Sequence, residues 1–143
     1  MNKALPEDAL LQLKQHAAKG REAMKSGDRA AAEAAFLAAW ACLPEPRTEY
    51  DHAQSLSRGL VAFYRDGGNV DRARHWYGVM RQAFGPQADP SSDFIGATVD
   101  FAAGDLDQAF RAFDALYKRF KARPFEGHDK KYLDFYKKRA AGA

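Results

Sequence analysis

Three stretches of the chain share one order of polar and apolar positions. Each begins with a glycine and a short polar residue. Alanine follows five positions after the glycine, an aromatic residue nine positions after it, and Ala, Met or Leu twelve positions after it. The stretches are GDRAAAEAAFLAAWACLP from Gly27, GNVDRARHWYGVMRQAFG from Gly68 and GDLDQAFRAFDALYKRF from Gly104, at intervals of 41 and 36 residues. A pattern that recurs at such intervals indicates a repeated pair of helices.

Turn signals between the apolar segments set the expected helix boundaries. The three glycines can adopt the left-handed conformation that ends a helix, and the Asp or Asn after each can cap the next one. Prolines at 44, 46, 86 and 124 close the second helix of each pair. The predicted helices are 7–26, 29–43, 47–66, 70–84, 91–103, 106–122 and 129–140. The length of helix 47–66 would explain the 41-residue interval.

These elements predict an all-α fold: a helical-repeat array of three antiparallel helix pairs plus a C-terminal capping helix, in one domain over residues 1–143. The final helix carries Tyr132, Phe135 and Tyr136 on one side and lysines largely on the other, as expected for a helix that covers the last repeat. The preceding loop contains Phe125, which we expect to lie under the array.

The repeat resembles the tetratricopeptide repeat (TPR) family, whose second helix carries A-x3-F followed by A and P. The expected repeats are 13–46, 54–87 and 90–123. The first matches best: Gly20 stands at the small-residue position of the first helix, and the markers of the second helix are Ala32, Phe36, Ala39 and Pro44. The resemblance implies that Phe36 fills the wedge between helices and that Trp40 packs toward the following repeat.

In TPR arrays the first helices of successive repeats line a concave groove. The resemblance therefore implies a groove that is basic in its first two repeats and aromatic in the third, which suits an acidic segment with an apolar anchor. The candidate residues are Lys14, Arg21, Lys25, Arg58, Arg65, Phe94 and Phe101. Arg21 and Gly59 stand where the family's chaperone-tail clamp has asparagines, so that form of binding is not expected.

Charge is unevenly distributed along the 143 residues. The net charge is +3, yet the chain from Lys118 onward contains nine Lys and Arg residues and only three Asp and Glu residues. A solvated helix is the simplest explanation of this basic end, but it could also bind an acidic partner or nucleic acid. The candidate residues there are Lys130, Lys131, Lys137 and Lys138. Stacking of bases on Tyr132 and Tyr136 would complete a nucleic-acid site.

No motif for catalysis, a metal or a cofactor is present in the sequence. The four histidines show no metal-binding spacing, and the single cysteine, Cys42, lies in an apolar helix end without a neighbouring base. No apolar run is long enough for a membrane span, and the N-terminal residues lack the pattern of a signal peptide. We therefore expect a cytoplasmic, non-enzymatic protein with no catalytic residue, metal or cofactor.

The expected function is recognition of one dedicated protein partner. The C-terminal part is similar to small bacterial TPR proteins that accompany secreted toxins, so the most concrete form is a toxin-neutralising immunity protein, next to a chaperone or adaptor of a secreted protein. Nucleic-acid binding through the basic C-terminal end is a less favoured alternative. Self-association into a homo-oligomeric scaffold, such as a homodimer, is a third.

Overall fold

The computed structural model describes residues 3–87 and 89–142, which form seven α-helices and two short 3-10 helices. The only β-type pairing among these residues is an isolated bridge between Lys3 and Tyr50. The helices, in chain order, are α1 (Glu7–Lys25), α2 (Arg29–Ala41), η1 (Arg47–Glu49), α3 (Asp51–Asp66), α4 (Val70–Phe84), α5 (Pro90–Ala102), α6 (Leu106–Phe120), η2 (Arg123–Phe125) and α7 (Lys130–Gly142).

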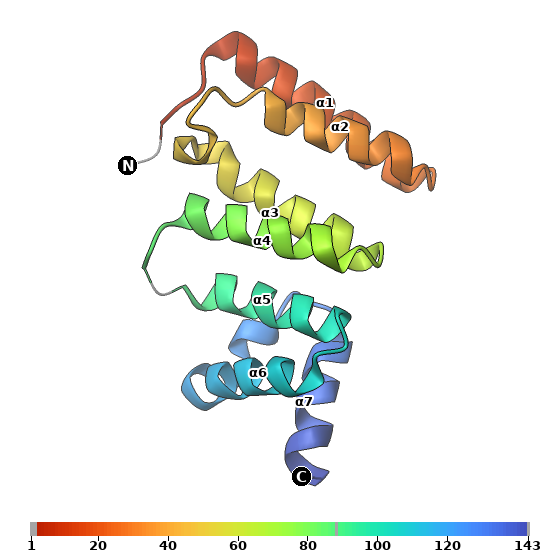
Figure 1. The fold of residues 1–143 in the computed structure, drawn as a ribbon, viewed down its shortest axis with the longest axis vertical. Coiled ribbons are helices and arrows are strands. Elements are labelled where there is room, and N and C mark those ends of the chain that lie inside the picture. The colour runs from red at the N-terminus through yellow and green to blue at the C-terminus, as the bar shows by residue number, and fades with distance from the viewer. Residues whose placement is uncertain (1–2, 88, 143) are drawn as a thin grey trace.

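The helices pack in sequential pairs. α1 lies against α2, α3 against α4 and α5 against α6, and the three pairs stack along the long axis of the molecule, with α7 at the C-terminal end (Figure 1). The contacts between pairs are made largely by α2 with α3 and by α4 with α5. The chain is therefore an all-α helical-repeat array, as the sequence predicts.

The turns inside the pairs form as the glycine pattern predicts. Gly27, Gly68 and Gly104 have φ angles of 79°, 79° and 80°, a region that costs glycine little. The Asp28 side chain then accepts a hydrogen bond from the Ala31 amide, and the Asn69 side chain accepts one from Arg72. Asp105 makes no such capping bond. Two of the three predicted caps therefore use their side chains.

A small residue lets the two helices of the first pair, α1 and α2, approach closely. Gly20 of α1 is buried, and the ring of Phe36 from α2 occupies the space where a side chain at position 20 would lie. Phe36 in turn meets Phe63 of α3 edge to face, with ring centroids 5.7 Å apart. Ala32 and Ala39 are fully buried. Phe36 thus fills the wedge between the first pair and α3, as expected.

Two tryptophans connect the first pair to the second. Trp40 of α2 contacts Trp76 of α4 edge to face, with ring centroids 5.0 Å apart. Edge-to-face aromatic pairs contribute about 0.5–1.5 kcal/mol beyond the area that they bury. Trp40 therefore packs toward the following repeat, in agreement with the sequence analysis.

The expected helix over 47–66 is wrong at its start. α3 begins at Asp51 and has 16 residues, and the chain before it forms an irregular connection that contains η1. Pro44 and Pro46 lack the amide hydrogen that a continuing helix would need. The backbone of Lys3 pairs with Glu49 and Asp51 at distances of 2.7 and 3.0 Å. The 41-residue interval exceeds the next one because this connection, residues 42–50, is longer than residues 85–89 before α5, and because α3 has 16 residues whereas α5 has 13.

The close approach at Gly20 gives a test of the packing. Gly20→Ala would place a methyl group against the Phe36 ring, so it should destabilise the fold by about 1–3 kcal/mol. Gly78→Ala, at an exposed position of α4 with nothing near the added carbon, should stabilise it by about 0.5–1 kcal/mol. Urea unfolding followed by circular dichroism measures both variants. Equal effects of the two substitutions would contradict the assigned contact.

Candidate functional site

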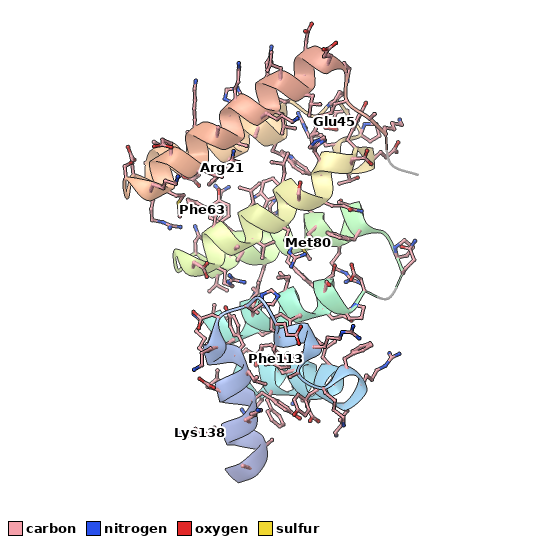
Figure 2. All side chains as sticks on the ribbon, turned by 180° about the vertical axis from the view of Figure 1, so that it is seen from behind. Arg21, Glu45, Phe63, Met80, Phe113 and Lys138 are labelled. Atoms are coloured by element: carbon pink, nitrogen blue, oxygen red, sulfur yellow. The ribbon has the colours of Figure 1, made fainter. Side chains whose placement is uncertain are left out.

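A pocket of about 630 Å³ opens between α1 and α3. Its walls are mostly apolar, and two basic side chains from α1 contribute to its lining. The lining residues are Leu13, Lys14, Ala17 and Arg21 from α1, Phe36 from α2, and Ser55, Leu56, Gly59 and Leu60 from α3. The structure therefore brings together two of the predicted groove residues, Lys14 and Arg21, with an apolar surface that the sequence did not predict. Arg21 is labelled on α1 in Figure 2.

Lys14 and Arg21 are free to meet a ligand. Both are exposed, and within residues 3–87 and 89–142 neither forms an ion pair. Lys25 is also exposed, in the last turn of α1, but it does not line the pocket. The pocket therefore combines apolar walls with uncompensated positive charge.

The predicted aromatic part of the groove is wrong for Phe94. Its side chain is fully buried, and its ring lies 5.2 Å from Phe113, 5.0 Å from Phe125 and 4.4 Å from His128, measured between centroids. A side chain in such a cluster cannot contact a partner at an open surface. Phe101 is half-buried and packs on Tyr132 and Phe135 of α7, at 5.4 and 5.1 Å.

The chain itself covers the third repeat. Residues 123–132 run from the end of α6 into α7 and pass over α5, on the face of the molecule that α1 and α3 also occupy (Figure 2). Phe125 is buried there, as expected. The helix sequence PSSDFIGATVDFA has only two charged residues, which is typical of a helix covered on several sides. This composition was the available signal that Phe94 would be covered.

The two arginines predicted on α3 lie beside this covering segment. Arg65 is largely buried: its guanidinium group pairs with Asp66 at 2.9 Å and donates to the Thr98 hydroxyl at 2.9 Å. Arg65 therefore joins α3 to α5 and is part of the scaffold. Arg58 is half-buried and lines a smaller hollow together with His128.

The four lysines of the C-terminal group are all exposed on α7, and Lys138 is labelled in Figure 2. The opposite side of α7 carries Tyr132 and Tyr136, which are 3% and 6% exposed. Because both rings are buried, the expectation that they stack on nucleic-acid bases is wrong. The remaining candidates, Lys130, Lys131, Lys137 and Lys138, form a charged surface without an aromatic platform.

α7 is anchored by polar as well as apolar contacts. The Tyr136 hydroxyl donates to Asp114 of α6 at 2.7 Å, and Arg139 pairs with Asp107 at the start of the same helix. Burial, together with the bond to the Asp114 carboxylate, raises the pKa of Tyr136 to about 12. α7 thus covers the last pair, as the amphipathic pattern predicts.

In the part of the chain that the structure describes, no three His, Cys, Asp or Glu side chains converge in a way that could hold a metal ion. Cys42 is half-buried, and its thiol donates to the Ala38 carbonyl at 3.4 Å. None of the helices in residues 3–87 and 89–142 combines the length and apolarity needed to cross a membrane.

Comparison of the chain with protein-family models, with curated proteins and with solved structures gives no match in any of the three.

His128 makes the stability of the covering segment dependent on pH. Burial, with the nearby Arg58 and Arg65, lowers the pKa of His128 below its ordinary value of 6.5. The unfolded chain then binds more protons than the folded chain just below pH 6.5, so stability should fall as the pH drops from 7.5 to 5.5. Thermal melts across this range should show a smaller pH dependence for His128→Gln and His128→Phe than for the natural chain. The same pH dependence in all three proteins would contradict the assignment.

Proposed function

We propose that this chain is a non-enzymatic binding module that holds an acidic segment of a protein partner, with an apolar anchor, in the pocket between α1 and α3. One observation carries the proposal: Lys14 and Arg21 line the same pocket as several apolar side chains. Neither residue forms an ion pair among the described residues. Repeat arrays commonly use the surface formed by successive helices for binding.

The dimensions of the pocket support a peptide ligand. Its volume of about 630 Å³ lies in the range of pockets that bury a compact ligand, about 300–1,000 Å³. Leu13, Leu56 and Leu60 would remove an apolar side chain from water, at roughly 25 cal/mol per Å². Lys14 and Arg21 would favour neighbouring carboxylates and select against basic partners.

The resemblance to the TPR family supports the same class of function. Toxin neutralisation in the bacterial cytoplasm is its most concrete form: an acidic part of the toxin would bind the pocket, and the array would then cover the toxin's active site. A chaperone or adaptor of a secreted protein would use the same contacts. The exposed lysines on α7 form a separate charged surface that takes no part in this contact.

Charge reversal tests the proposal without disturbing the core. Lys14→Glu combined with Arg21→Glu should abolish capture of a stoichiometric partner from the native lysate, because the rim of the pocket would then repel an acidic segment. Quantitative mass spectrometry of the captured proteins compares this variant with the natural chain.

The matched control is Lys137→Glu combined with Lys138→Glu, which makes the same charge change on α7. This control should retain the partner, and both variants should melt near the natural chain because they replace exposed side chains. The proposal fails if the natural chain captures no stoichiometric partner, or if the two double variants capture it equally well.

A further inference from the structure

A second hollow, of about 340 Å³, lies on the other side of α3 from the apolar pocket. Arg58 of α3, Arg123 of η2 and His128 of the covering segment all line it. Glu126 is the only acidic residue among the lining residues. Three basic groups from two separate parts of the chain, α3 and the covering segment, therefore converge on one concave site.

The positive charge at this hollow exceeds the negative charge that lines it, because Glu126 is the single carboxylate beside Arg58 and Arg123 among the described residues. Arg58 and Arg123 form no ion pair with any described residue. The two acidic residues of α3, Asp51 and Asp66, each lie about two turns from Arg58, and Asp66 already pairs with Arg65. Asp129 accepts a hydrogen bond from the backbone amide of Lys131. The pKa of His128 is lowered first by burial and then by the nearby Arg58 and Arg65.

Between the two hollows, the surface of α3 carries no bulky side chain at Gly59. Arg58 is the immediate neighbour of Gly59, which lines the apolar pocket, and Ser55 lies one turn earlier. Gly59 is exposed and carries no side chain, and a carbon added there would meet nothing within 4 Å. An extended polypeptide seated between α1 and α3 can therefore cross α3 at Gly59 and reach the second hollow.

We propose that Arg58, Arg123 and His128 form an oxyanion site, which receives a carboxylate or phosphorylated side chain of the polypeptide bound between α1 and α3. This inference rests on the proposed function and adds the chemistry of a second anchor. Arginine matches both groups because its planar guanidinium can donate two parallel hydrogen bonds to a carboxylate or a phosphate. His128 would add a further donor, because its imidazole ring keeps one N–H group even when it is neutral.

Small anions test the site directly. We would titrate the natural chain with inorganic phosphate and, separately, with glutarate at constant ionic strength, and follow the His128 ring signals by NMR. We expect a saturable change with at least one anion, and binding weakened about tenfold in Arg58→Gln and in Arg123→Gln, the loss expected for one charge-assisted hydrogen bond. Saturation by phosphate alone would assign a phosphorylated side chain, and saturation by glutarate would assign a carboxylate.

The control is Arg111→Gln, which removes an exposed arginine of α6 that does not line the hollow. It should bind the anions as the natural chain does. Absence of a saturable change with both anions, or equal binding in Arg58→Gln, Arg123→Gln and the control, would overturn the inference. Dispersed amide spectra of each variant would show that it is folded.

The anion-binding test of the second hollow and the partner-capture test of the proposed function can fail independently. Lys14→Glu combined with Arg21→Glu should still bind the small anions, because neither residue lines the second hollow. If no anion binds but partner capture still depends on Lys14 and Arg21, the oxyanion site fails and the proposed function stands. If anions bind as expected but capture is insensitive to Lys14 and Arg21, the proposed function fails instead.

Discussion

The burial of Phe94 is the constraint on which the rest of the surface depends. A phenylalanine in the first helix of the third pair would face solvent unless another part of the chain covered it. The chain covers it with Phe125, His128 and Tyr132, all within 6.0 Å of its ring centroid. Fully burying such a side chain contributes about 1.5–3 kcal/mol, which makes the cluster a major support of the C-terminal pair.

This burial also decides where the array is open. Because residues 123–132 lie over α5, the groove expected along all three repeats is closed at the third. What remains is the apolar pocket between α1 and α3 on one side of α3, and the basic hollow between α3 and the covering segment on the other. The covering segment supplies two of the three basic groups in that hollow. The same segment that covers α5 therefore also forms one wall of the basic hollow.

The sequence predicts most of the fold because its strongest signals are local. Gly27 and Gly68 end helices through their own backbone preference, and Asp28 and Asn69 cap the next ones within three residues. The late start of α3 is missed because residues 47–50 contain no residue that excludes a helix, and their backbone pairs instead with Lys3, more than forty positions earlier in the chain. The core position of Phe94 is missed because it depends on residues about thirty positions later, and the pattern of α5 does not say what covers each side.

The candidate site is less predictable because charge does not distinguish a scaffold residue from a binding residue. Arg65 and Arg21 both stand in the first helix of a repeat and are both predicted to line the groove, yet Arg65 is held by Asp66 and Thr98 whereas Arg21 is exposed and has no ion pair within the described residues. Removing a buried, hydrogen-bonded charge leaves its partners unsatisfied and destabilises the fold. An exposed, unpaired charge contributes little to stability. Lys14 and Arg21 can therefore be selected for binding alone, and their substitution separates recognition from folding, which a change at Arg65 cannot do.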